Sequence, residues 1–227
     1  MSSPAIPDDL RYVAIEGVIG AGKTSLTRRL SERYNGSTVL EAFDENPFLA
    51  DFYDEPDRWA FHTQLSFLAS RFKQKRALFD RDLFRQVVFS DYTFDKDKIF
   101  AHLTLTGDER TLYDTLFNLV EPTIPVPDLV VYLRSSTDRL MANIAKRGRS
   151  YELEMKRSYI ESLGEAYDYY FDRYDKCPLL IVDSTRIDFV NNPEHLEALV
   201  HQIIGVQHAG TRYFAPDAAP DMFGELL

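Results

Sequence analysis

Cysteine is almost absent from this chain of 227 residues, and so is any long apolar run. Cys177 is the one cysteine, so no internal disulfide can form, and its place just before Pro178 favours an incidental thiol over a catalytic one. No stretch has the length and apolarity of a transmembrane helix, and no signal-peptide pattern opens the sequence. These absences predict a cytoplasmic protein with no membrane partner.

Positive charge is also scarce. The 26 Lys and Arg residues stand against 36 Asp and Glu, which gives a formal net charge of −10. Such a chain is repelled by a polyphosphate backbone, so no nucleic-acid partner is expected, and phosphate ligands should be small and held in a locally basic pocket. The apolar fraction of 44% is ordinary for a globular domain and sufficient for one sizeable core.

The glycine-rich stretch over residues 17–24 is the most informative part of the chain. It reads Gly-Val-Ile-Gly-Ala-Gly-Lys-Thr between an apolar run and a helical pattern, which is the context that a phosphate-binding P-loop requires. Glycines let successive N–H groups turn towards an anion, and the following helix adds the positive end of its dipole. The lysine is expected to reach the β- and γ-phosphates of ATP, and the threonine to bind Mg²⁺. The predicted nucleotide-binding residues are Gly17, Val18, Ile19, Gly20, Ala21, Gly22, Lys23, Thr24 and Ser25.

Five short β-branched runs recur along the chain, with helical patterns between them. This alternation predicts an α/β fold with a five-stranded parallel sheet flanked by helices. Ligands bind outside the carboxyl ends of such strands, so Glu16, Glu41, Asp91 and Asp183 are expected to converge near the P-loop. The predicted strands cover residues 12–16, 37–41, 86–90, 128–133 and 179–183, and the predicted helices follow residue 23 and cover 56–84, 95–105, 108–120, 137–147, 155–174 and 193–204.

A single domain is predicted for residues 11–205, because no repeat, linker or low-complexity segment interrupts them. Residues 1–10 are polar and contain proline, which is typical of a loose arm. Residues 206–227 are rich in Ala, Pro and Asp and are predicted to form a tail along the surface.

A second set of motifs narrows the class of P-loop protein. The Asn-Lys-x-Asp signature of Ras-type GTPases is absent, whereas a motif runs from Tyr53 through Trp59-Ala60-Phe61-His62-Thr63-Gln64 to Arg71. Together with Glu41, Ile99-Phe100-Ala101 and Lys146-Arg147-Gly148-Arg149, it resembles the deoxynucleoside kinase family over about residues 11–204. The resemblance implies a P-loop kinase fold with an arginine-bearing lid, which transfers the γ-phosphoryl group of ATP to the 5′-hydroxyl of a deoxynucleoside.

The resemblance also implies roles on the acceptor side. Glu41 resembles the carboxylate that contacts the 5′-hydroxyl as general base, where orienting the hydroxyl matters more than early deprotonation because the transition state is loose. Tyr53 and Glu152 resemble the pair that binds the 3′-hydroxyl. Gln64, eleven residues after Tyr53 on the same stretch of the predicted long helix, resembles the amide that pairs with the base. Arg71 lies seven residues further on and resembles the arginine beside the base; a surface position stays open for Arg71 and Glu152.

Two arginines belong to the implied lid. Arg147 and Arg149 resemble groups that neutralise charge on the transferring phosphoryl group, an effect worth about 10³-fold or more in rate for such arginines. Arg147 is expected to contact ATP as well. Asn143 stands where family members often carry another arginine, which removes one phosphate contact, and residues 185–191 resemble the loop that holds adenine. The predicted catalytic residues are Glu41, Lys23, Arg147 and Arg149.

The chain departs from the family pattern after its third predicted strand. Most relatives have Asp/Glu-Arg-Ser there, with the acid near Mg²⁺, whereas this chain has Ser90-Asp91-Tyr92. An ungapped comparison puts Asp91 in the place of the arginine, and a shift of one residue makes it the acid. We favour Asp91 as an Mg²⁺ ligand together with Thr24, usually through water, because Mg²⁺ prefers few carboxylates and several waters. A bacterial branch that phosphorylates purine deoxynucleosides also carries Asp-Tyr here.

Lys96 is the second departure. It falls where the animal enzymes place an aspartate that pairs with the base-contacting arginine, so its ammonium is expected to repel Arg71. It could instead donate to N7 or O6 of a purine, which predicts a preference for deoxyguanosine or deoxyadenosine. A solvated helix residue is the open alternative.

Two other functions are compatible with the P-loop. A nucleoside monophosphate kinase such as thymidylate kinase would need further basic residues for the acceptor phosphate, whereas the acceptor side here offers Tyr53, Gln64 and Glu41. A non-catalytic structural subunit with this fold would not need Lys23, Thr24 and Glu41. The resemblance further suggests a homodimer built on helices, with residues 56–84 and 108–120 as candidates for its buried face.

Overall fold

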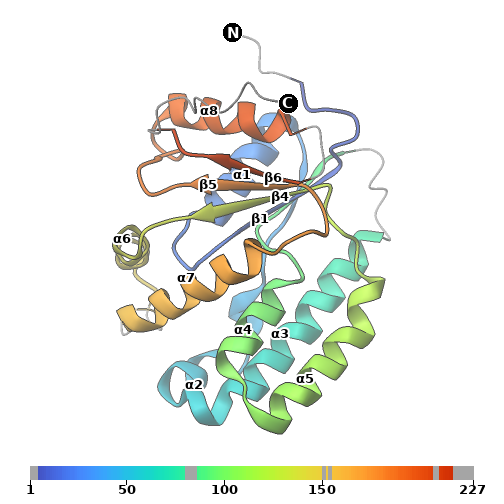
Figure 1. The fold of residues 1–227 in the computed structure, drawn as a ribbon, viewed down its shortest axis with the longest axis vertical. Coiled ribbons are helices and arrows are strands. Elements are labelled where there is room, and N and C mark those ends of the chain that lie inside the picture. Colours follow the sequence, from blue (N-terminus) through green and yellow to red (C-terminus); the bar gives the residue numbers. More distant parts are fainter. Residues whose placement is uncertain (1–4, 80–85, 150–151, 153–154, 207–209, 217–227) are drawn as a thin grey trace.

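The computed structural model describes residues 5–79, 86–149, 152, 155–206 and 210–216. Within these residues, six parallel strands form one sheet in the order β2-β3-β1-β4-β5-β6 (Figure 1). The central strand β1 lies between β3 and β4, so the P-loop that follows it opens at the middle of the carboxyl edge. The strands are β1 (Tyr12–Gly17), β2 (Ser37–Val39), β3 (Val88–Ser90), β4 (Leu129–Arg134), β5 (Leu179–Asp183) and β6 (Thr211–Phe214).

The central strands are buried on both faces. Every residue of β1 is buried, and so is every residue of β4 except Arg134. This burial explains why these segments are almost continuously apolar in sequence rather than alternating. Glu16 is the exception in β1, and its buried carboxylate accepts hydrogen bonds from the Gly17 and Thr93 amides, at 3.2 and 2.6 Å, and from the Tyr167 hydroxyl at 3.2 Å.

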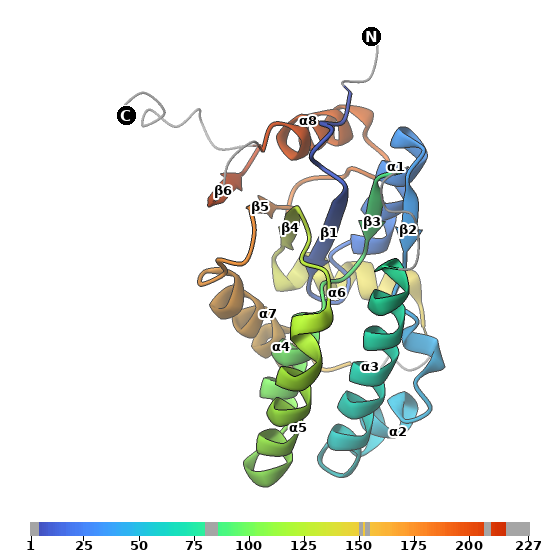
Figure 2. The same cartoon turned by 90° about the vertical axis from the view of Figure 1, so that its right-hand side faces the viewer.

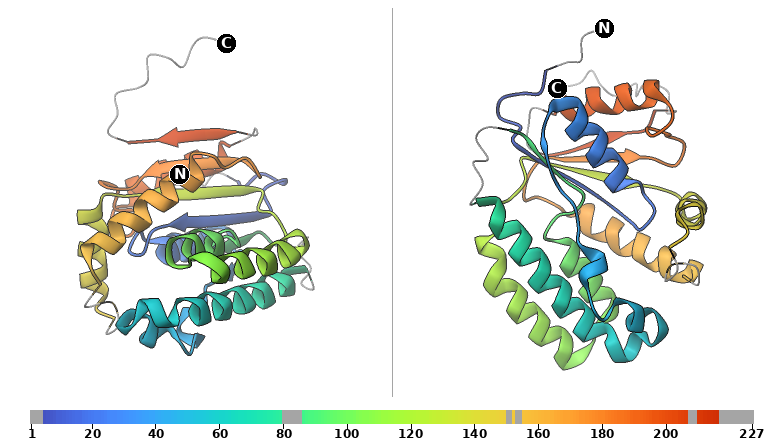
Figure 3. Two further views of the ribbon diagram at one scale, coloured as in Figure 1. Left: turned by 60° about the horizontal axis from the view of Figure 1, so that its bottom comes forward. Right: turned by 180° about the vertical axis from the view of Figure 1, so that it is seen from behind.

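Helices cover both faces of the sheet (Figure 3). On one face, α1 and α8 lie together, joined by the Arg33–Glu197 ion pair. On the other face, α7 packs against β4 and α4, while α6 crosses the carboxyl edge. The helices named here are α1 (Lys23–Tyr34), α4 (Lys96–Thr104), α6 (Thr137–Arg147), α7 (Arg157–Phe171) and α8 (Pro193–Ile204).

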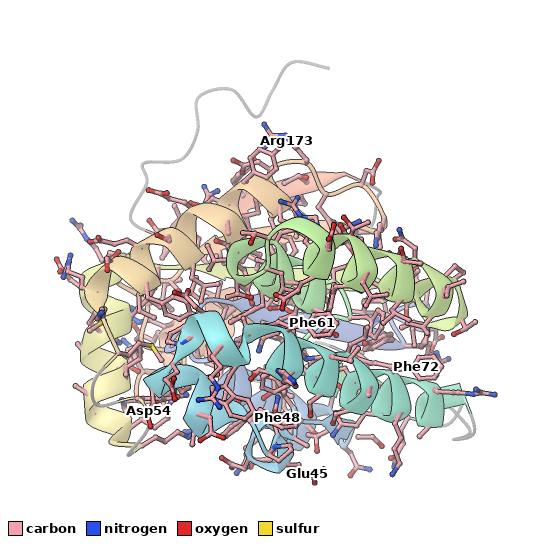
Figure 4. The ribbon with its side chains drawn as sticks, turned by 90° about the horizontal axis from the view of Figure 1, so that it is seen from below. Glu45, Phe48, Asp54, Phe61, Phe72 and Arg173 are labelled. Atoms are coloured by element: carbon pink, nitrogen blue, oxygen red, sulfur yellow. The ribbon has the colours of Figure 1, made fainter. Side chains whose placement is uncertain are left out.

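A second helical layer extends beyond the sheet and carries the acceptor side of the site. Figure 2 shows α3 (Pro56–Phe79) and α5 (Gly107–Val120) running side by side, with α2 (Leu49–Asp54) at the end of α3. Figure 4 views this layer from below and labels Phe48, which precedes α2, Asp54, which ends it, and Phe61 and Phe72 of α3. Short 3₁₀ turns, η1 (Phe43–Glu45) and η2 (Glu121–Thr123), complete the described elements. A second apolar cluster holds the layer together and comprises Phe52, Ala60, Leu68, Phe94, Ala101, Leu105, Tyr113 and Phe117.

The predicted architecture is confirmed, with one correction to the sheet. The five predicted strands are present, and the helices predicted at 137–147 and 193–204 have those limits in the structure. The sheet has six strands because Thr211–Phe214 pairs in parallel with β5, within the segment predicted to be a surface tail. At the other end, Leu10 belongs to the buried core, so the predicted arm is packed over its last part. Residues 80–84 of the predicted long helix lie outside the described residues.

Candidate active site

The P-loop has the backbone conformation that its glycines predict. Gly20 and Gly22 have φ angles of 87° and 93°, in the left-handed region that favours glycine. A side chain at Gly20 would also collide with its surroundings, because a Cβ atom there would lie 2.7 Å from the Leu140 carbonyl oxygen. The loop runs directly into α1 at Lys23, so the N-terminus of the helix points at the turn. This arrangement forms a backbone cradle for an anion.

Lys23 lies across this cradle. Its Nζ donates to the carbonyl oxygens of Gly17 and Val18, at 2.8 and 3.1 Å. Burial and, to a lesser extent, the nearby Lys96 lower the pKa of the Lys23 ammonium to about 8, against the opposing charges of Glu16 and Glu41. Within the described part of the chain, the hydrogen bonds of this cation therefore go to carbonyl oxygens of the loop and not to a carboxylate.

Thr24 and Asp91 meet beside the P-loop, as their predicted metal role requires. The Thr24 hydroxyl donates to Asp91 Oδ2 at 2.5 Å, and Asp91 Oδ1 accepts the Glu41 amide at 2.8 Å. One hydroxyl and one carboxylate are hard oxygen ligands of the kind that Mg²⁺ takes beside substrate phosphates and water. The described residues contain no cluster of three His, Cys, Asp or Glu side chains suited to a metal, so any ion here would depend on these two groups and on the nucleotide.

Glu41 is the carboxylate at the centre of the acceptor side. It lies two residues after β2, and its side chain binds two buried cations: Arg71 Nε donates to Oε1 at 2.9 Å, and Lys96 Nζ donates to Oε2 at 2.5 Å. Burial alone would raise the pKa of Glu41, but Lys96 and Arg71 together lower it well below its usual range. Glu41 is therefore an ionised hydrogen-bond acceptor at any physiological pH.

The predicted position of Lys96 next to Arg71 is wrong. The partner of Arg71 on α4 is Asp97, which is fully buried and forms an ion pair with Arg71 Nη1. Arg71 is thus clamped between Asp97 and Glu41, whereas a repelling Lys96 was expected beside it. Lys96 points to Glu41, and its ammonium also lies 5.4 Å from the centre of the Phe100 ring. The ungapped comparison puts Lys96 in the place of the aspartate, whereas the register shifted by one residue, in which Asp91 is the acid, puts Asp97 there.

A cavity of about 100 Å³ opens in front of Glu41. Gln64 is almost completely buried there, and its Oε1 has no hydrogen-bond partner among the described residues. An unpartnered buried amide oxygen favours a ligand with an N–H group, as a nucleobase has. The cavity is lined by predicted residues from both sides of the site, including Ile19, Lys23, Thr24, Glu41, Tyr53, Gln64, Arg71, Asp91, Lys96, Arg147, Arg149 and Glu152.

Tyr53 reaches this cavity from a different element than expected. It belongs to α2, and Glu55 separates that short helix from α3, so Tyr53 and Gln64 are not on one helix. Hydrophobic periodicity alone did not predict α2, which has six residues. The two side chains nevertheless line the same cavity.

The lid arginines are anchored by Glu152. Arg147 makes a bidentate contact with Glu152, with Nε to Oε2 at 3.0 Å and Nη2 to Oε1 at 2.6 Å. Arg149 approaches the same carboxylate at 3.4 Å and lies 3.8 Å from the centre of the Phe43 ring. Glu152 is therefore buried rather than a surface residue, and it connects the lid to the wall of the acceptor cavity.

A second cavity, of about 380 Å³, lies on the other side of the P-loop. Its walls combine Ser25 and the glycines of the loop with Arg147 and residues 187–191, where the adenine-binding loop was expected. Asn143 donates to the Gly20 carbonyl at 2.8 Å, so the residue that replaces a family arginine supports the loop itself. The two cavities thus meet at the P-loop.

The predicted convergence of strand ends is confirmed for three of four acids. Asp91 and Glu41 line the acceptor cavity, and Glu16 is buried directly beneath the P-loop, bonded to Gly17. Asp183 is exposed and accepts a hydrogen bond from the Thr185 amide in its own loop, so it serves the turn after β5.

Comparisons with known proteins agree with this geometry. Residues 13–207 match the family described as deoxynucleoside kinase. The chain is 32% identical over 207 residues to the deoxyadenosine/deoxycytidine kinase of Bacillus subtilis (strain 168), covering 86% of this chain and 93% of that protein. It is 33% identical over 197 residues to the deoxyguanosine kinase of the same strain, covering 85% and 95%. The structure of deoxyadenosine kinase from M. mycoides with the products dCMP and a flexible dCDP has a TM-score of 0.74 at 27% identity, covering 85% of this chain and 98% of that one. The chain belongs to the deoxynucleoside kinase family.

Proposed function

We propose that this enzyme transfers the γ-phosphoryl group of ATP to the 5′-hydroxyl of a purine deoxynucleoside, giving the 5′-monophosphate. One observation carries the proposal: Glu41, an ionised carboxylate, shares the wall of the acceptor cavity with Lys23 and Thr24 of the P-loop. A neutral alcohol can donate a hydrogen bond to such a group, whereas an acceptor phosphate would be repelled by it. The arrangement therefore favours a nucleoside over a nucleoside monophosphate as acceptor.

In the proposed reaction, Glu41 accepts the hydrogen bond of the 5′-hydroxyl and holds its oxygen in line with the γ-phosphorus. Its low pKa makes it a weak base, which suits a loose transition state in which the proton leaves late. Lys23 and the lid arginines Arg147 and Arg149 neutralise charge on the transferring group. Mg²⁺, when bound through Thr24 and Asp91, would add charge neutralisation at the β- and γ-phosphates.

For the nucleoside itself, we assign the base to Gln64 and Arg71 and the sugar to Tyr53 and Glu152. The purine preference is supported by the deoxyguanosine and deoxyadenosine kinases among the relatives, although one of these is also named for deoxycytidine. Lys96 lines the same cavity and donates a hydrogen bond to Glu41, which supports a role beside the 5′-hydroxyl rather than the predicted role at the purine base.

A panel of acceptors tests the proposal. With saturating ATP and Mg²⁺, we expect kcat/KM to be highest for deoxyguanosine or deoxyadenosine, and to be negligible for deoxynucleoside monophosphates. Product analysis by chromatography identifies the phosphorylated position. A faster pyrimidine would refute the purine preference, while turnover of monophosphates alone would establish a monophosphate kinase.

The charge state of Lys23 gives a pH dependence for ATP binding. A bound polyphosphate stabilises the ammonium and raises its pKa from about 8, so binding above pH 8 must take up a proton. We expect the affinity for ATP, measured by calorimetry, to be constant just below pH 8 and to fall about tenfold per pH unit above it. Lys23→Arg is the matched control, because its guanidinium stays charged and its profile should be flat. A flat profile for the parent enzyme would contradict the role of Lys23.

We also propose a homodimer. Leu112 and Leu119 lie seven residues apart on α5 and are 50% and 69% exposed, which leaves an apolar stripe on one of the two helices expected to form the interface.

No helix in the described part of the chain is long and apolar enough to cross a membrane. The cytoplasmic location stays a prediction.

A further inference from the structure

Lys75 is a buried cation that the proposed reaction does not use. It lies on α3 with a fully buried side chain, and its Nζ makes three hydrogen bonds to the described residues, each to an uncharged oxygen. These are the Tyr12 hydroxyl at 2.6 Å, the Ser90 hydroxyl at 2.7 Å and the Tyr92 carbonyl at 2.9 Å. Burying an ammonium is costly, so a lysine in such a place requires an explanation beyond ordinary packing.

Lys75 contacts the residues on both sides of Asp91 in the chain. Ser90 and Tyr92 are the residues on either side of it, and the Ser90 hydroxyl also donates to the Tyr92 carbonyl at 2.7 Å. The three-residue turn is therefore closed on itself and fastened to α3, while Tyr12 fastens the same ammonium to β1. The conformation of this turn determines where the Asp91 carboxylate meets Thr24 and the Glu41 amide.

One face of α3 thereby holds both acids of the site. Arg71 and Lys75 are four residues apart, so their side chains lie one turn apart on the same face of the helix. Arg71 binds Glu41, and Lys75 binds the turn that carries Asp91. A single helix thus sets the distance between the acceptor carboxylate and the carboxylate beside Thr24.

The three contacts persist whether or not Lys75 is protonated. An ammonium donates to all three oxygens, whereas a neutral amine can donate to Ser90 and Tyr92 and accept from the Tyr12 hydroxyl. Burial lowers the pKa of Lys75 to about 7, against Glu16, Asp91 and Glu41, which raise it, while Arg71 lowers it. A change of charge at neutral pH would therefore leave the turn in place.

We propose that Lys75 is a positioning residue that fixes the Ser90-Asp91-Tyr92 turn and so sets the strength with which the site holds Mg²⁺ on the nucleotide. This inference rests on the proposed function, specifically on Asp91 as a metal ligand. Residues that orient metal ligands commonly contribute about 10- to 100-fold to metal affinity. Lys75 should therefore affect the metal-dependent part of ATP binding and leave the metal-free part unchanged.

Calorimetry separates these two parts. The dissociation constant of ATP is measured with Mg²⁺ and again with EDTA. The Kd in EDTA divided by the Kd with Mg²⁺ reports how much the contact between the site and the metal strengthens ATP binding. We expect Lys75→Met to reduce this ratio about 10- to 100-fold while ATP binding in EDTA stays within twofold of the parent. Tyr12→Phe is the matched control: it removes a hydrogen bond of similar length from the same ammonium on the β1 side, so it should lower the melting temperature and leave the ratio unchanged.

Double variants make the test specific. In an Asp91→Asn background, Lys75→Met should have no further effect on the ratio, because the ligand it positions is already lost. An unchanged ratio in Lys75→Met, with a reduced one in Asp91→Asn, would overturn the role of Lys75 and leave the proposed function intact. An unchanged ratio in Asp91→Asn itself would overturn Asp91 as a metal ligand. If Lys75→Met does not fold, Ser90→Ala replaces it, because it removes one of the two oxygens of the turn that Lys75 binds, and the same outcomes apply.

Discussion

Glu41→Gln is expected to lower kcat by about 10²- to 10⁴-fold, the range for loss of a positioned general base. The amide keeps the shape of the side chain and can still accept a hydrogen bond, but it cannot take the proton of the 5′-hydroxyl. ATP affinity should change little, because the proposed ATP site is formed by the P-loop and the second cavity, which Glu41 does not line. Steady-state kinetics with the preferred deoxynucleoside, together with calorimetric ATP binding, measure both quantities.

The control for Glu41→Gln is Glu45→Gln, which makes the same chemical change at an exposed acid in the neighbouring 3₁₀ turn, labelled in Figure 4. It should leave kcat unchanged. The loss of charge at Glu41 also leaves Lys96 and Arg71 with one partner fewer, so thermal unfolding must establish that the variant is folded at the assay temperature. A kcat within twofold of the parent in folded Glu41→Gln would remove this carboxylate from the reaction.

Local sequence patterns predicted the P-loop and the acids that follow the second and third strands. The P-loop is a contiguous motif whose conformation depends on its own glycines, and Glu41 and Asp91 follow strands whose carboxyl ends must meet at one edge. The sixth strand could not be predicted in this way, because Thr211–Phe214 is short and three of its four residues are exposed. Its pairing with β5 is a property of the assembled sheet.

The predicted contacts of the acceptor side depended on the register in which α4 is compared with the family pattern, and a single sequence does not determine that register. Successive residues of a helix point about 100° apart, so a shift of one position exchanges the directions of Lys96 and Asp97. The sequence comparison placed Lys96 opposite Arg71, whereas the fold places Asp97 there. Lys75 was missed for a related reason: a lysine in a helix is normally solvated, and only the packing of α3 against the turn after β3 buries it.

Asp97→Ala is expected to reduce the free energy of unfolding by about 3–5 kcal/mol, the cost of removing one partner from a buried ion pair. Arg71 is only 3% exposed, so its guanidinium cannot exchange Asp97 for water without opening the interface between α3 and α4. Burial raises the pKa of Asp97 to about 6, although Arg71 opposes this, so the carboxylate is ionised at pH 8. Urea unfolding at that pH measures the loss, and Asp97→Asn, which removes the charge but keeps a hydrogen-bonding group, should lose less.

Glu161→Ala is the matched control for Asp97→Ala. It breaks an ion pair with Arg157 of 2.9 Å in which both side chains are about half exposed, and such pairs contribute about 0.5 kcal/mol or less. The comparison separates the effect of burial on the free energy of unfolding from the effect of having an ion pair at all. Because Arg71 also binds Glu41, Asp97→Asn should raise KM for the deoxynucleoside while Glu161→Ala leaves it unchanged. Equal losses of stability in Asp97→Ala and Glu161→Ala would show that Arg71 does not depend on Asp97, and the acceptor side would then need another explanation for its orientation.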